Sequence, residues 1–132
     1  MLFFLHIPKT AGTTFYDVVK KNYDSFLKPK VENDPNKYLE VNLNSKNSSF
    51  AIRLPGGYQT APEILKIISQ LHENQVNKIK FIGGHVGYGF HESINEKIDY
   101  ISFIREPKER IISDFYEHNK KGRHFYISIK DN

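Results

Sequence analysis

The sequence predicts an α/β protein of the three-layer α/β/α class, P-loop-like, with a central parallel sheet. Three apolar runs of strand length stand at Met1–Ile7, Lys78–Ile82 and Tyr100–Ile104. A turn rich in Gly, Pro or charged residues follows each of them. Strand, turn and helix therefore recur along the chain, and this order implies right-handed crossovers and a parallel sheet covered by helices.

Length and composition predict one folded domain over residues 1–132. The chain has 132 residues, of which 39% are hydrophobic, with ten Phe and eight Tyr. That content favours a packed globule over a disordered chain. The net charge of +4 suits an anionic ligand such as a nucleotide, an acidic glycan or a nucleic acid, without choosing among them.

The absence of cysteine excludes disulfides, thiolate nucleophiles and Cys-ligated zinc. It also suits a reducing compartment. The N-terminus shows no secretory signal pattern, and no apolar run approaches the length of a membrane helix. We therefore expect no membrane span and a cytoplasmic location.

The first element should be a buried strand over Met1–Ile7, because this run is short and rich in Phe, Leu and Ile. A turn follows at Pro8–Thr13. A helix is expected from Thr14, since Thr14 with Asp17 three residues later forms a capping-box pattern.

The middle of the chain is less regular. Residues 28–49, which contain two Pro and many Asn, predict a long loop with a short strand possible at Tyr38–Leu43. Phe50–Leu54 suits another short strand. Pro62 should open a helix, since apolar residues then recur on one face, at Ile64, Leu65, Ile68 and Leu71.

The last third repeats the strand and turn pattern. The strand at Lys78–Ile82 runs into a Gly-rich stretch at Gly83–Glu92. After the strand at Tyr100–Ile104, Pro107 should occupy the first turn of a helix. An apolar face is expected on that helix, formed by Ile111, Ile112, Phe115 and Tyr116.

Distinctive polar stretches follow the predicted strands directly. They are Pro8–Thr14, Gly83–Glu92 and Arg105–Ser113. In open α/β sheets, ligands bind at the carboxyl ends of the strands. The sequence therefore predicts that these stretches meet at one site.

The turn Pro-Lys-Thr-Ala-Gly-Thr-Thr has the parts of an anion site. A helix N-terminus offers free N–H groups and a partial positive charge. Lys9 adds a full charge, Gly12 allows close approach of the backbone, and hydroxyl donors come from Thr10, Thr13 and Thr14. The Lys precedes the Gly, unlike the G-x-x-x-x-G-K-[ST] order of nucleotide P-loops, so an ordinary ATPase or GTPase is disfavoured.

A second basic site is predicted in "IREPKERIISDFY". An Arg fork at Arg105 and the hydroxyl of Ser113 suit a phosphate monoester. Arg110 lies three residues before Ser113 and shares its helical face. An ion pair of Arg110 with Asp114 or Glu106 is an equally good interpretation.

These two motifs resemble those of PAPS-dependent sulfotransferases, where PAPS is 3′-phosphoadenosine 5′-phosphosulfate. "HIPKTAGTTF" is similar to the 5′-phosphosulfate loop, most closely in the carbohydrate branch that includes heparan sulfate O-sulfotransferases, although Ala11 stands where many relatives have Gly. "IREPKERIISDFY" resembles the 3′-phosphate motif R-x-P-x-x-R-x-x-S-x-Y. Phe115 occupies the position of its Tyr, and Tyr116 follows one residue later.

The resemblance implies a transferase that moves a sulfuryl group from PAPS to a hydroxyl, leaving the product PAP, with no metal. Lys9 is then a catalytic residue that stabilises charge on the leaving phosphate. The implied donor-binding residues are Lys9, Thr10, Ala11, Gly12, Thr13, Thr14, Arg105 and Ser113.

The general base should be a histidine, because imidazole titrates near neutrality. His85 follows a predicted strand in "GGHVGYG", and the family's glycan-modifying members carry a similar stretch with His as base. Alternatively, His85 orders the Gly-rich loop or contacts a sulfonate oxygen. His91 and Glu92 are further candidates, whereas His6 is expected to pack under the first loop.

The acceptor is expected to be a carbohydrate or polysaccharide, and no nucleic-acid partner is expected. Basic residues that could meet an acidic saccharide are Lys28, Lys30, Arg53, Lys120, Lys121 and Arg123, although solvated surface lysines are more common. The family normally continues past the corresponding C-terminus, so a short or truncated member is implied. The competing hypotheses are a non-catalytic PAPS- or PAP-binding module and, less favoured, a P-loop kinase-like phosphotransferase.

Overall fold

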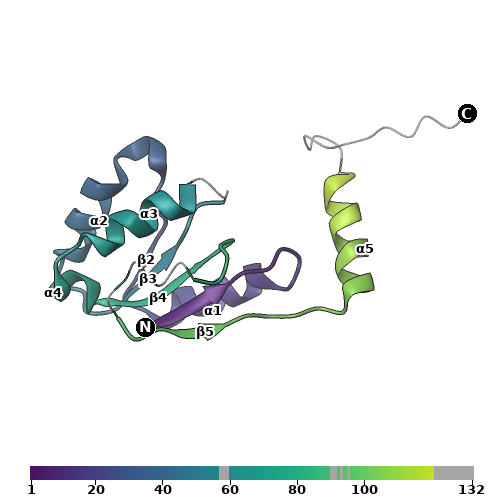
Figure 1. The fold of residues 1–132 in the computed structure, drawn as a ribbon, viewed down its shortest axis with the longest axis horizontal. Helices are drawn as coiled ribbons and strands as arrows, with labels where there is room; N and C mark the ends of the chain where they lie inside the picture. The colour runs from purple at the N-terminus through teal and green to yellow at the C-terminus, as the bar shows by residue number, and fades with distance from the viewer. Residues whose placement is uncertain (57–59, 90–91, 93, 95, 121–132) are drawn as a thin grey trace, which may run out of the picture.

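A five-stranded parallel sheet forms the centre of the molecule, with the strand order β2-β3-β4-β1-β5. The computed structural model describes residues 1–56, 60–89, 92, 94 and 96–120. All neighbouring strands pair in parallel. The strands are β1 (Leu2–Leu5), β2 (Ser25–Leu27), β3 (Phe50–Arg53), β4 (Ile79–Gly84) and β5 (Asp99–Ile101). The predicted α/β class with a parallel sheet is confirmed (Figure 1).

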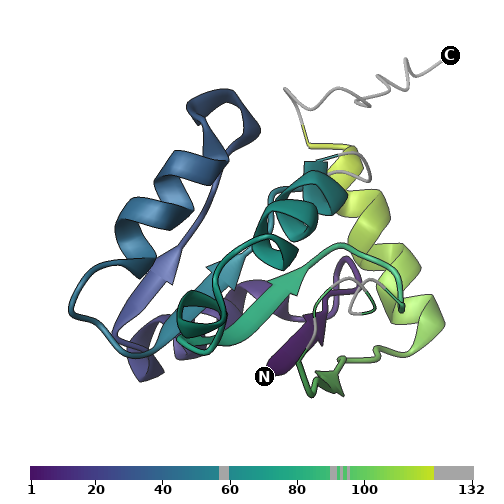
Figure 2. The same cartoon turned by 60° about the vertical axis from the view of Figure 1, so that its left-hand side comes forward.

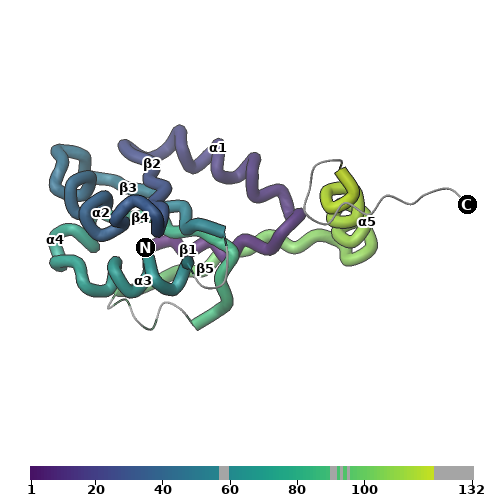
Figure 3. The backbone as a smooth tube through the Cα atoms, turned by 90° about the horizontal axis from the view of Figure 1, so that it is seen from above, coloured from purple at the N-terminus to yellow at the C-terminus, as the bar shows by residue number. Residues whose placement is uncertain are grey.

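Helices cover both faces of this sheet. These helices are α1 (Gly12–Asn22), α2 (Pro35–Leu43), α3 (Thr60–Ser69) and α4 (Glu73–Val76), with a 3-10 turn η1 (Val31–Asn33). A further helix, α5 (Pro107–His118), lies outside these layers. Seen from above, α1 lies on one side of the strands and α3 and α4 lie on the other (Figure 3). Within the described ranges, no helix combines the length and the apolar character that crossing a membrane requires.

Two adjacent residues of β1 show how the layers are held together. Phe3 and Phe4 are both fully buried. Successive side chains of a strand point to opposite faces. Phe3 accordingly joins the larger core beneath α2 and α3, while Phe4 packs against Tyr16 and Val19 of α1. The sheet is therefore the middle of three layers.

Helix α1 begins at Gly12, two residues earlier than the sequence predicted. Ala11 is the N-cap and has a left-handed backbone with φ 65°. Thr14 lies inside the helix and caps nothing, and Asp17 pairs with Lys20 at 3.0 Å. The predicted capping box is therefore wrong. The helix starts at the left-handed backbone of Ala11, without a side-chain cap.

Residues 28–49 are not the long loop that their composition suggested. The segment contains η1 and α2, so the predicted strand over Tyr38–Leu43 is also wrong. The carboxylate of Asp34 accepts a hydrogen bond from the Lys37 N–H at 3.1 Å, and Pro35 occupies the first turn. Leu39 and Leu43, four residues apart, are fully buried. Burial of this apolar stripe outweighs the low helix propensity of the Asn residues.

Replacing Leu39 with alanine should lower the free energy of unfolding by about 2–4 kcal/mol, because the side chain is fully buried in the larger core. Val41 lies on the same helix but is 64% exposed, so Val41→Ala should change stability by less than about 0.5 kcal/mol. Urea unfolding of both variants measures the difference. Equal effects would contradict the packing of α2.

Helix α5 stands apart from the sheet, beyond the loop that follows β1 (Figures 1 and 2). It begins at Pro107 as predicted, and the Glu106 carboxylate accepts from the Glu109 N–H at 2.8 Å. None of its residues is buried. The side chains of its expected apolar face are exposed, namely Ile111, Ile112, Phe115 and Tyr116. β5 is also shorter than predicted and ends at Ile101, because the chain then leaves the sheet toward α5.

Candidate functional site

The carboxyl edge of the sheet carries a cavity of about 580 Å³, a size common among ligand sites. Residues of the loop after β1, the segment after β4 and the stretch Arg105–Ser113 all contribute to it, so the predicted meeting of these stretches is observed. Its lining consists of His6, Pro8, Lys9, Ala11, Gly12, Thr13, Arg53, His85, Arg105, Ser113 and Glu117.

The loop after β1 has an unusual backbone. Lys9 and Ala11 adopt left-handed conformations, with φ of 67° and 65°, which residues with a Cβ seldom do. The Thr10 hydroxyl donates to the Ile7 carbonyl at 2.7 Å and ties the loop together. A left-handed residue followed by a helical one, here Ala11 and Gly12, makes a concave group of N–H donors that suits an anion.

The imidazole of His6 lies directly over Gly12. A Cβ on Gly12 would overlap the His6 ring, so the glycine is needed for this packing. The ring also stacks on Phe4, with centroids 5.3 Å apart, and on His85 at 4.3 Å. His6 therefore packs under the loop, as expected, and it supports His85 from below.

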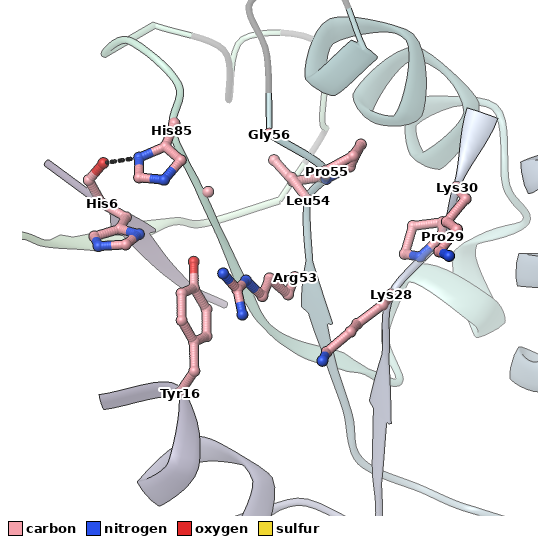
Figure 4. Close-up of a pocket in the computed structure, with 11 residues that line it drawn as sticks. His6, Tyr16, Lys28, Pro29, Lys30, Arg53, Leu54, Pro55, Gly56 and His85 are labelled. Atoms are coloured by element: carbon pink, nitrogen blue, oxygen red, sulfur yellow. Dashed lines mark hydrogen bonds between the residues drawn. The ribbon is translucent and has the colours of Figure 1, made fainter. Parts of the chain in front are cut away.

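His85 is held by a hydrogen bond that fixes its tautomer. Its Nδ1 lies 2.8 Å from the His6 carbonyl oxygen (Figure 4). A carbonyl can only accept, so Nδ1 carries the proton and Nε2 of the neutral ring is left as an acceptor. This arrangement fixes the orientation of the ring and leaves Nε2 as a nitrogen acceptor at the cavity.

His6 is kept neutral by its surroundings. Burial, then the neighbouring His85, then Arg53 lower its pKa from 6.5 to about 4. The folded pKa lies below the unfolded value, so the unfolded chain binds more protons between these values. Stability from this group is present above pH 6.5 and is lost as the pH falls toward 4.

We therefore expect the wild-type protein to lose about 1–2 kcal/mol more stability between pH 6.5 and 4 than His6→Phe does. The loss stays in this range because solvent reaches the half-buried ring and screens its charge. Phenylalanine keeps a flat ring on Phe4 and His85 but cannot titrate. Urea unfolding at pH 4 and pH 6.5 compares the two proteins, and parallel pH dependences would count against a neutral His6.

The cations of the cavity have carboxylate partners. Lys9 Nζ lies 3.5 Å from Glu117 Oε2, and the same oxygen lies 2.7 Å from Lys120 Nζ. Arg105 contacts Glu109 at 3.4 Å. Glu117 thus puts an acidic oxygen next to Lys9 in the cavity where an anion is expected.

Not every predicted site residue reaches the cavity. Neither Thr10 nor Thr14 lines the cavity. Thr10 is buried, and its hydroxyl donates to the Ile7 carbonyl, whereas Thr14 is exposed on α1. Arg110 is exposed and also lies outside the lining. Neither suggested partner pairs with it, since Asp114 contacts His118 at 3.5 Å and Glu106 caps α5.

Neither of the other candidate bases, Glu92 and His91, is observed at the cavity. Glu92 does not line the cavity, and His91 lies outside the described residues. Over the part of the chain that the structure describes, no three His, Asp or Glu side chains gather as a metal-binding group.

Tyr16 and Glu117 belong to this region but were not predicted. Tyr16 lies one helical turn after Gly12, and Glu117 one turn after Ser113, so helical spacing from the motifs could have found both. Tyr16 is 1% exposed, and among the described residues its hydroxyl has no hydrogen-bond partner. Burial, opposed by Arg53, raises its pKa to about 12.

Comparison with known proteins gives one family. The model of the sulfotransferase family matches residues 1–131. Neither the curated proteins nor the solved structures gave a match. The family match spans nearly the whole chain, including both motifs predicted to bind anions and His85. The chain therefore belongs to the sulfotransferase family.

Proposed function

We propose that this chain transfers a sulfuryl group from PAPS to a hydroxyl of a carbohydrate. The observation that carries the proposal is the shared cavity of Lys9, Arg105, Ser113 and His85. Cationic donors from two different elements and a base of fixed tautomer face the same space. These are the groups that a donor with separate anionic ends and a neutral nucleophile would need.

The donor end of the site fits a ligand with two anionic groups. Lys9 and the N–H groups of Ala11 and Gly12 would hold the 5′-phosphosulfate. Arg105, just before α5, and Ser113, in the middle of that helix, would hold the 3′-phosphate. When bound, PAPS supplies the sulfuryl group and a phosphate leaving group. ATP has no 3′-phosphate and would leave Arg105 and Ser113 without that contact.

The acceptor hydroxyl would lose its proton to His85 Nε2. The acceptor oxygen forms a bond to sulfur while the bond from sulfur to the bridging oxygen of the 5′-phosphate breaks. Lys9 stabilises the charge that collects on this leaving oxygen, and the loop holds the reacting groups in line. The His6 carbonyl keeps the His85 ring oriented throughout.

Titration calorimetry with PAP, ATP and AMP tests the donor assignment. PAP should bind more tightly than ATP or AMP, and Arg105→Ala should weaken PAP binding about 10- to 100-fold through loss of a charge-assisted contact. Arg110→Ala is the matched control, because Arg110 is a nearby arginine, on the first turn of α5, but lies outside the cavity lining. An equal preference for ATP would reject the proposal.

Transfer of radiolabelled sulfate from PAPS to a panel of glycans then separates an enzyme from a binding module. Sulfated product from at least one glycan supports the proposed enzyme. Tight PAP binding without transfer to any glycan would favour the non-catalytic module. A parallel assay with ATP labelled in its γ-phosphate tests the kinase-like alternative, which labelled phosphate on the glycan would favour.

A further inference from the structure

The backbone of His6 ties the end of β1 to the end of β4. Its N–H donates to the Gly84 carbonyl at 2.9 Å, and its own carbonyl oxygen lies 2.8 Å from Nδ1 of His85. These two hydrogen bonds hold the backbone of His6 against the segment that carries the proposed base. The imidazole of His6 takes no part in either bond, so its contacts are a separate feature.

That imidazole lies between the start of α1 and the His85 ring. On one side it packs so closely over Gly12 that a Cβ there would overlap it. On another its face stacks on His85, with centroids 4.3 Å apart and planes 25° from parallel, and the pair can be followed in Figure 4. Phe4 stacks on it as well, at 5.3 Å and 17°. One flat side chain thus spans the distance from a residue proposed to hold the donor to the proposed base.

The hydrogen bond to the His6 carbonyl does not by itself hold the plane of the His85 ring. A ring bonded through one nitrogen can still tilt about that bond, whereas a ring stacked on a fixed neighbour loses its contact when it tilts. Burial above all lowers the pKa of His6 to about 4, so its ring is neutral at pH 7. It therefore does not repel the positive charge that His85 gains when it takes the acceptor proton.

We propose that the His6 ring is a positioning residue, which keeps Nε2 of His85 aimed at the acceptor hydroxyl and fixes the spacing between this base and Gly12. The inference rests on the proposed function. The His6 ring itself takes up no proton and acts only through His85. Its loss should therefore slow the chemical step and leave the affinity for the donor unchanged.

Nitrogen NMR of protein with isotope-labelled histidine tests the position of the His85 ring without any ligand. His6→Leu removes the flat ring and His6→Phe keeps one, while the backbone carbonyl at this position remains in both. Phe15→Leu is the control, because Phe15 also packs on Phe4, with centroids 4.7 Å apart, but lies outside the cavity lining. The His85 signals are those that disappear in His85→Gln, and thermal unfolding checks that each variant is folded.

Wild type, His6→Phe and Phe15→Leu should each show one tautomer of His85, with the proton on Nδ1. His6→Leu should show exchange between the two tautomers, because a tilting ring loses its bond to the carbonyl. Wild-type signals of His85 in His6→Leu would overturn the proposal.

Gly12→Ala tests the contact on the other side of the His6 ring. The added Cβ overlaps this ring and displaces it, so the His85 signals should change. In His6→Ala there is no ring to displace, and adding Gly12→Ala should then leave the His85 signals as they are in His6→Ala. Equal changes in the two backgrounds would mean that the His6 ring does not connect Gly12 to the base.

Rates of sulfuryl transfer measure the consequence for the reaction. His6→Leu should lower kcat about 10- to 100-fold, with PAP affinity within about twofold of wild type, and His6→Phe should recover most of the rate. In a His85→Gln background, His6→Leu should cost less than about twofold, since the ring acts through His85. Additive losses in the double variant, or an unchanged kcat in His6→Leu, would contradict the proposal.

The NMR measurements keep this inference separate from the proposed function. If the wild-type protein neither binds PAP nor transfers sulfate, the proposed function fails. The His85 signals of the His6 variants still decide whether the His6 ring positions His85.

Discussion

Replacement of Lys9 with alanine is expected to lower the rate of sulfuryl transfer about a thousandfold. Its ammonium lies on the loop after β1 and faces the cavity, where it would stabilise charge on the leaving phosphate. The fold should tolerate the change. The lost pair with Glu117 is partly exposed, and such pairs contribute about 0–1 kcal/mol. Initial rates with radiolabelled PAPS and unfolding curves measure the two effects separately.

Lys20→Ala is the control for Lys9→Ala, because Lys20 is on the neighbouring helix and also loses a carboxylate partner, Asp17 at 3.0 Å. It should leave the rate within about twofold of wild type. PAP affinity in Lys9→Ala should fall less than the rate, since the charge on the leaving oxygen grows in the transition state. A Lys9→Ala protein with normal transfer would remove Lys9 from the mechanism.

His85→Gln should lower kcat about 10²- to 10⁴-fold while leaving PAP affinity unchanged. Glutamine can still donate a hydrogen bond toward the His6 carbonyl, but it cannot accept a proton from the acceptor. The variant therefore separates the base from the structural role of the side chain. Single-turnover rates with a saturating acceptor measure the chemical step.

His118→Gln is the control for His85→Gln. His118 is on α5, paired with Asp114 at 3.5 Å, and does not line the cavity. It should keep wild-type kcat. If His85→Gln raised KM alone, His85 would be an acceptor contact, and if it weakened PAP binding, it would be a donor contact. Either result would contradict its role as the base.

Much of the sheet was predictable because buried parallel strands are short, apolar runs. β1, β3 and β4 were expected within a few residues of their observed bounds. β2 was not predicted, since its three residues, Ser25–Leu27, are too short for a pattern. The helix α2 was not predicted although Asp34 and Pro35 are typical of a helix start, because the Asn-rich composition around them is typical of a loop.

The meeting of the polar stretches was predictable from topology, since parallel strands end at one edge. The side chains that contact Lys9 and Arg53 were not predictable in this way. Glu117 approaches Lys9 only because α5 stands beside the β1 loop, a placement that no local pattern fixes. The stacking of Arg53 on Tyr16 likewise joins the end of β3 to α1 across the sheet. Side-chain pairs between distant segments require the tertiary structure.

The pairing of Lys9 with Glu117 makes the protein carry its own counter-ion. A ligand that enters the donor cavity must exchange with this carboxylate, so it gains only the difference between two anions at the same cation. A small monovalent ion gains little from such an exchange. A ligand that also reaches Arg105 and the loop N–H groups gains at several points together. We therefore expect the site to favour ligands with several linked anionic groups over the simple salts that surround it.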